Sequence, residues 1–112
     1  FWRYEEVKNM KVYNKLIRDK IPGIMRAEGK NFKAHIASNE EYKQKLKEKL
    51  LEEAKEFLED PCLEEIGDVA EVFGAILEAF DYSVEDLQRQ VLNKIADRGS
   101  FIERIILESV EE

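Results

Sequence analysis

Two pairs of acidic residues flank a short break in the middle of the chain. Before the break, Glu53 and Glu56 stand three positions apart. After it, Glu65 and Asp68 have the same spacing. Side chains three positions apart on a helix lie next to each other, about 5–6 Å between Cβ atoms, so each pair presents two carboxylates to one place. Oxygen ligands of this kind suit Mg²⁺. The four residues therefore predict a site for a hard divalent cation, provided that the two pairs meet.

The break at Pro61 decides whether they meet. A connection this short joins helices that run antiparallel to each other. With a rise of about 1.5 Å per residue, Glu56 then comes level with Glu65. By the same reasoning, Glu53 comes level with Asp68. All four carboxylates are expected at one height on the seam between two helices.

The direction in which these side chains point can also be predicted. With a turn of about 100° per residue, Glu65 falls inside the apolar stripe of its helix, between Val72 and Val69. Asp68 falls at the edge of that stripe. An unpartnered carboxylate on a buried face costs several kcal/mol or takes up a proton, and a shared cation removes that cost.

There is a plainer interpretation of each acidic pair taken singly. Glutamates on acidic helices usually face solvent, where neighbouring lysines neutralise them. The matched levels and the inward position of Glu65 favour a metal site for the set of four. Glu52, Glu64 and Glu71 point farther from the seam and are expected to face solvent, with Glu52 as an outer ligand.

Helices must position these carboxylates, and the chain predicts an all-α fold. Ser38 and Glu41 form a capping box that starts a helix near Asn39, which runs to about Glu59. A second helix is expected from about Leu63 to Phe80, antiparallel to the first. The residues expected to face inward are Leu46, Leu50, Ala54, Phe57, Leu58, Ile66, Val69, Val72, Phe73, Ile76, Leu77 and Phe80.

Further elements lie on either side of this hairpin. Pro22 suits the first turn of a short helix that ends near Gly29. Residues 32–37 alternate weakly and favour a short extended piece. Ser83 caps a third long helix, which ends at Gly99. The tail after Gly99 fits either a short strand or a helical turn.

Composition excludes several function classes. The chain has 112 residues, 44% of them apolar, and a net charge of −7, so we expect one folded domain that does not bind nucleic acid. It has no apolar run long enough for a membrane span and no signal peptide, which predicts a cytoplasmic protein. Cys62 is the only cysteine, so no intrachain disulfide forms. Met10 is a natural start, so residues 1–9 are expected to be either an upstream extension or residues added in cloning, ahead of a domain over residues 10–112.

The acidic pairs resemble the signature of the MazG-like all-α NTP pyrophosphatase superfamily, which is E-E-x-x-E followed by E-x-x-D. Residues 52–56 (EEAKE) and 65–68 (EIGD) match it. Residues 13–22 (YNKLIRDKIP) are similar to the N-terminal motif of a branch related to phosphoribosyl-ATP pyrophosphohydrolase, and residues 93–101 (NKIADRGSF) resemble the ending of that branch. The resemblance covers nearly all of the chain after Met10. The eight residues between Glu56 and Glu65 are fewer than is typical, which shortens the loop and leaves both motifs intact.

The resemblance implies Mg²⁺-dependent cleavage between the α and β phosphates of a nucleoside triphosphate, with Mn²⁺ as a substitute. Glu53, Glu56, Glu65 and Asp68 would hold the metal, and either Glu53 or Glu56 would activate the attacking water. The candidates for binding the substrate phosphates are Arg18, Lys20, Lys94 and Arg98. For Lys94 and Arg98, complementing the dipole at a helix C-terminus is an equally good explanation.

Two other functions remain open. Phosphoribosyl-ATP hydrolysis is the same chemistry on a bulkier substrate. A helical partner-binding module would retain the acidic motif without turnover. The broad apolar face of the hairpin also predicts that a second copy covers it, in a homodimer or homotetramer. His35, the only histidine, is expected at the surface.

Overall fold

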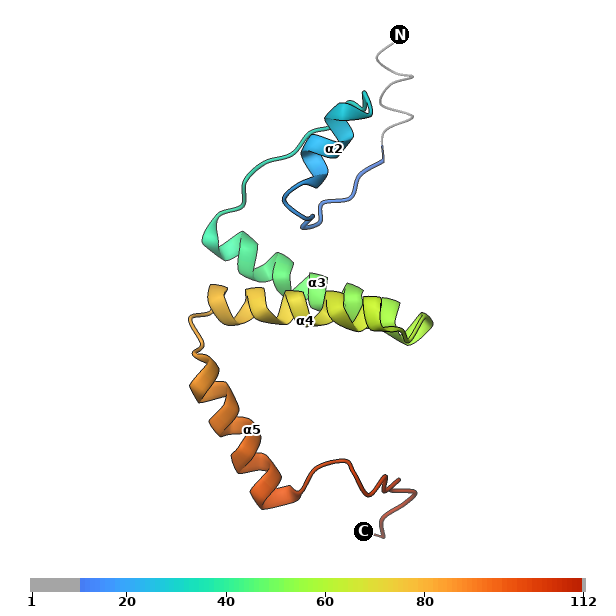
Figure 1. Ribbon diagram of the computed structural model, residues 1–112, viewed down its shortest axis with the longest axis vertical. Helices are drawn as coiled ribbons and strands as arrows, with labels where there is room; N and C mark the ends of the chain where they lie inside the picture. Colours follow the sequence, from blue (N-terminus) through green and yellow to red (C-terminus); the bar gives the residue numbers. More distant parts are fainter. Residues whose placement is uncertain (1–10, 112) are drawn as a thin grey trace. The chain divides into compact units, whose positions relative to one another are not determined.

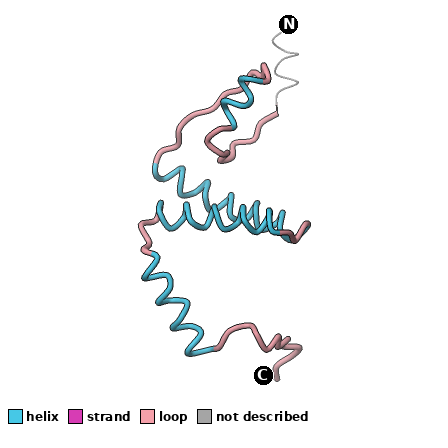
Figure 2. The backbone as a smooth tube through the Cα atoms, in the orientation of Figure 1, coloured by secondary structure: helices cyan, strands magenta, loops and turns pink. Residues whose placement is uncertain are grey.

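The computed structural model describes residues 11–111, and these residues contain helices and no strand (Figures 1 and 2). The all-α prediction is therefore confirmed for the described part of the chain. The prediction that residues 1–9 are an extension lies outside the described residues. The helices are α2 (Ile21–Ala27), α3 (Asn39–Glu59), α4 (Leu63–Ala79) and α5 (Val84–Arg98).

Serine side chains start the two helices that the sequence predicted to begin with a cap. Ser38 Oγ accepts a hydrogen bond from the Glu41 amide at 3.2 Å, and Ser83 Oγ accepts one from the Asp86 amide at 3.0 Å. Each bond satisfies an amide that has no partner within its own helix. The Glu41 carboxylate does not turn back to complete the capping box, because it lies 2.8 Å from Nε2 of the exposed His35.

Local backbone geometry ends the helices near the predicted positions. Gly99 follows α5 with a φ of 83°, a left-handed conformation that glycine adopts without steric cost. Gly29, with a φ of 74°, lies one residue beyond the C-cap of α2. The short extended piece expected at residues 32–37 is irregular instead.

Helices α3 and α4 pack side by side as an antiparallel hairpin joined at residues 60–62 (Figure 1). Leu46 is buried on their seam, at 1% exposure. The prediction that Leu58, Ile66 and Phe73 face inward is wrong within the single chain, because all three are exposed. A pair of helices has one seam, so apolar residues at the flanks of each stripe stay uncovered.

The chain divides into two compact units, one ending at Phe80 and the other beginning at Asp81. The first contains α2, α3 and α4, and the second contains α5 and the tail. Residues 101–103 form a turn, and residues 104–111 have no regular structure, so the strand alternative for the tail is wrong. A single domain over residues 10–112 stays a prediction. Among the described helices, none is both long and apolar enough to cross a membrane.

Candidate metal centre

Three of the four predicted carboxylates meet on the seam between α3 and α4. Glu53 comes from α3, whereas Glu65 and Asp68 come from α4. Each offers one oxygen, and the three oxygens lie within 4.8 Å of one another. Opposite oxygens around one Mg²⁺ or Ca²⁺ ion are about 4–5 Å apart, twice the usual metal–oxygen distance. The predicted level of Glu53 with Asp68 agrees with this geometry. We call these three residues the acidic triad.

Two oxygens of the acidic triad have no hydrogen-bond partner. Glu53 is buried, at 7% exposure, and Glu65 is half-buried. Glu53 Oε2 and Glu65 Oε2 are both shielded from solvent without a donor in the described part of the chain. Buried polar atoms in folded proteins are nearly always paired, and an unpaired carboxylate oxygen is particularly costly. A divalent cation is the kind of group that satisfies both atoms at once.

The pKa values of Glu53 and Glu65 also indicate that their negative charges lack a sufficient counter-charge. Burial, followed by the neighbouring Glu56 carboxyl, raises the pKa of Glu53, although Lys49 Nζ lies 3.3 Å from Glu53 Oε1 and opposes the shift. Burial raises the pKa of Glu65 as well, and the negative charge of Asp68 adds to it. Both shifts mean that the fold disfavours the charged carboxylates. A bound cation would reverse that preference.

Glu56 lies outside the acidic triad. It is exposed on α3, next to Glu53. Three residues along a helix correspond to a rotation of about 300°, so Glu56 lies about 60° round from Glu53, towards solvent. Its predicted role as a metal ligand stays a prediction.

Lys15 and Arg18 reach the two arms of the hairpin. Lys15 Nζ donates to Glu52 Oε1 of α3 at 3.0 Å. Arg18 Nη2 donates to Asp68 Oδ1 of α4 at 2.8 Å, and its Nη1 pairs with Glu71. Arg18, predicted as a phosphate ligand, therefore lies beside the acidic triad. Sequence reasoning did not select Lys15 as a site residue, although it lies three positions before Arg18 within the motif of residues 13–22.

Glu52 differs from the prediction of a solvent-facing residue. Its side chain is 30% exposed, and Lys15 and Lys49 both pair with it. Burial alone would raise the pKa of Glu52, but these two lysines hold it below its ordinary value. Glu52 is thus a neutralised neighbour of the acidic triad, and an outer-ligand role for it stays a prediction.

The other predicted phosphate ligands lie farther along the chain. Lys20 is exposed at the start of α2 and forms no ion pair within residues 11–111. Lys94 and Arg98 are exposed on α5 in the second unit, where Arg98 Nε lies 3.7 Å from Asp97 Oδ2. Contact of these three residues with a substrate stays a prediction.

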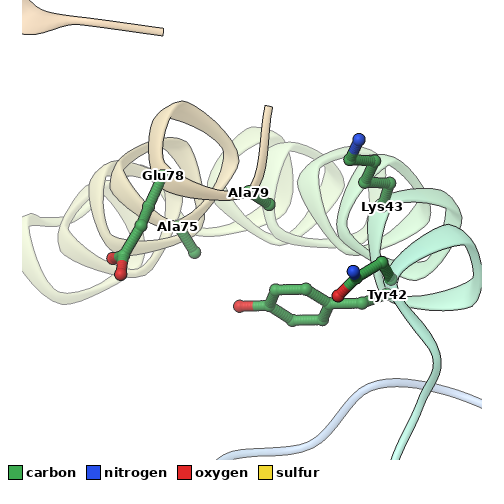
Figure 3. Close-up of a pocket in the computed structure, with 6 residues that line it drawn as sticks. Tyr42, Lys43, Ala75, Glu78 and Ala79 are labelled. Carbon is green, nitrogen blue, oxygen red and sulfur yellow. The ribbon is translucent and has the colours of Figure 1, made fainter. Parts of the chain in front are cut away.

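A hollow of about 340 Å³ lies at the opposite end of the hairpin from Pro61. Figure 3 shows the Tyr42 ring pointing from α3 towards the side on which Ala75 and Glu78 of α4 lie, whereas the Lys43 side chain points upward in this view. Tyr42 precedes Glu53 by eleven residues, or roughly 16 Å along α3. The hollow contains no predicted site residue, so it is separate from the acidic triad.

Comparison of this chain with protein-family models, with curated proteins and with solved structures finds no match. Its function must therefore be argued from its own residues and their geometry.

Proposed function

We propose that the chain is a Mg²⁺-dependent nucleoside triphosphate pyrophosphohydrolase that acts on surplus or non-canonical nucleotides. One observation carries the proposal: Glu53 Oε2 and Glu65 Oε2 are buried without a hydrogen-bond partner among residues 11–111, in a group of three carboxylates spaced closely enough to share one ion. The motif resemblance supplies the reaction type. Arg18, beside Asp68, supplies a positive charge at the edge of the same site.

In this proposal the residues of the chain have distinct roles. Glu53, Glu65 and Asp68 hold the metal from both arms of the hairpin. A bound Mg²⁺ supplies neutralisation of the charge that develops on the phosphate oxygens. The Arg18 guanidinium donates a charge-assisted hydrogen bond to a phosphate oxygen.

Glu56 is the proposed general base. It adjoins Glu53, is exposed, and lies outside the acidic triad, so its carboxylate is accessible to a water molecule. It accepts a proton as the water oxygen bonds to phosphorus. The bond from that phosphorus to the α–β bridging oxygen breaks, giving a monophosphate and pyrophosphate.

We also propose that the protein assembles into a homodimer or homotetramer. The hairpin exposes large apolar side chains on its own, and a second copy would cover them. Exposed examples on α3 and α4 are Leu51, Leu58, Leu63, Ile66 and Phe73. Light scattering over a range of concentrations checks this, since a mass that stays monomeric throughout would contradict it.

A nucleotide panel tests the proposed reaction. The protein is incubated with Mg²⁺ and each of the common NTPs, dNTPs, several base-modified triphosphates and phosphoribosyl-ATP, and both pyrophosphate and monophosphate are quantified. The proposal predicts equal amounts of the two products and none in the presence of EDTA. Turnover of phosphoribosyl-ATP alone would transfer the assignment to that reaction. No product from any nucleotide, together with no Mg²⁺ binding, would favour a non-catalytic helical module.

A further inference from the structure

Residues 13–18, which we call the strap, are fixed to α3 by two lysine contacts. Lys45 Nζ of α3 donates to the Asn14 carbonyl oxygen at 2.6 Å. Lys15 Nζ of the strap donates to Glu52 Oε1 at 3.0 Å. Neither contact involves a member of the acidic triad. The α3 side of the strap is thus attached independently of any cation.

The other end of the strap is attached to the acidic triad itself. Arg18 Nη2 lies 2.8 Å from Asp68 Oδ1, and Arg18 Nη1 pairs with Glu71 one turn farther along α4. The Arg18 side chain is 56% exposed, so water is available to replace either bond. Arg18 therefore neutralises a carboxylate that the proposed function assigns to the metal.

A divalent cation and the Arg18 guanidinium should oppose each other at this carboxylate. Both are positive and both draw on the electron density of Asp68, so each weakens the binding of the other. By thermodynamic linkage the effect is reciprocal: if Arg18 lowers cation affinity, the cation lowers the equilibrium constant of the Arg18–Asp68 pair by the same factor. For a half-exposed ion pair, that factor is up to about fivefold.

We propose that a divalent cation bound at the acidic triad displaces Arg18 Nη2 from Asp68, and that this frees the Nη2 side of the guanidinium to bind a phosphate of the nucleotide while Nη1 stays paired with Glu71. The inference rests on the proposed function and adds an order of events to it. The strap stays attached through Asn14 and Lys15, so the released arginine remains within a side chain's reach of the site. Metal-free protein is then blocked in two ways, because it lacks the ion and its phosphate-binding arginine is engaged.

Measurements of cation affinity distinguish two roles for Arg18: a competitor that the cation displaces from Asp68, and an outer-sphere residue that orients Asp68 for the cation. Mn²⁺ binding is measured by calorimetry for the unaltered protein, for Arg18→Gln and for Arg26→Gln, which removes an equal charge from α2. Arg18→Gln should bind Mn²⁺ about two- to fivefold more tightly, and Arg26→Gln should match the unaltered protein. If Arg18 instead orients Asp68 for the metal, Arg18→Gln weakens binding by about 10- to 100-fold, and the inference is overturned. Unchanged affinity also overturns it, whereas no binding by the unaltered protein overturns the proposed function itself.

The arginine side-chain NMR signals of the unaltered protein give an independent readout. Arg89 is the internal control, because it pairs with Asp86 at 2.7 Å on α5. On saturation with diamagnetic Mg²⁺, the Arg18 guanidinium signal should move away from its metal-free position, because the bond to Asp68 is lost while that to Glu71 remains, and the signal of Arg89 should stay in place. An Arg18 signal that keeps its paired position at saturation would contradict displacement.

Discussion

The α3–α4 hairpin and helix α5 both carry acidic side chains, but they place them in opposite environments. On α5, Asp86 lies 2.7 Å from Arg89, and both side chains are about two-thirds exposed. On the hairpin, Glu53 is buried, and one oxygen each of Glu53 and Glu65 has no hydrogen-bond partner among the described residues. Both helical regions have acidic residues in their first turns. The difference shows that position on a seam between helices, rather than acid content, distinguishes a candidate metal site from a solvated face.

The largest expected effect is the difference in turnover between two variants that each neutralise one carboxylate, one on the hairpin and one on α5. Glu65→Gln should lower pyrophosphate release by at least about 100-fold, since it removes a direct ligand and even outer-sphere changes cost up to that much. Asp86→Asn should leave the rate unchanged within about twofold, because Asp86 is exposed and its ion pair within the described residues is with Arg89 of its own helix. Turnover in the presence of saturating Mg²⁺ is the measurement. An equal loss in both variants would remove the distinction between the regions.

A smaller effect is expected from pH on the metal-free protein. Burial raises the pKa of Glu53 and of Glu65 above the ordinary value near 4.5. At these two groups the folded state therefore binds more protons than the unfolded state between that value and the raised ones, so their contribution to the free energy of unfolding falls as pH rises through this window. Urea unfolding in EDTA, at several pH values from about 4.5 upward, checks the slope. Glu65→Gln should make the slope less negative, whereas Asp86→Asn should not change it. A slope that Glu65→Gln leaves unchanged would show that the fold does not disfavour the charged Glu65 carboxylate.

The smallest effect concerns the helix caps. Ser38→Ala and Ser83→Ala each remove a side-chain acceptor for a first-turn amide, which should cost about 1 kcal/mol of stability. Ser83→Ala acts on α5 and should leave Mg²⁺ affinity unchanged. Thermal unfolding and Mg²⁺ titration of both variants check this. A clear loss of Mg²⁺ affinity in Ser83→Ala would link α5 to the acidic triad and end the contrast between the two regions.

Local signals in the sequence were sufficient to predict where the three long helices begin and end, to within a residue. The serine caps and Gly99 predicted the boundaries of α3 and α5, and Pro61 predicted the hairpin, because these residues act on the backbone within a few positions. Predicting Phe80 as the last residue of α4 missed by one, since Phe80 is the C-cap. Helix ends of this kind fray, and no cap residue fixed this one.

The positions of site residues could be predicted where the geometry of a single helix determines them. They could not be predicted where they depend on how helices rotate against each other or on contacts of long side chains. Level-matching brought Glu53 next to Asp68. Angular position placed Glu65 inside the apolar stripe, and the structure has it half-buried. The exposed position of Glu56 depends on how far α3 rotates against α4, which no residue spacing determines. The ion pair between Arg18 and Asp68 joins residues fifty positions apart and depends on how the strap folds back.

The most direct test of the central claim is the binding of a divalent cation to the acidic triad. Mg²⁺ and Mn²⁺ are titrated by calorimetry into the metal-free protein, into Glu53→Gln/Glu65→Gln and into the matched control Asp86→Asn. We predict saturable binding by the unaltered protein and by Asp86→Asn, and loss of that binding in the double variant. Absence of saturable binding by the unaltered protein, or equal binding by the double variant, would contradict the account.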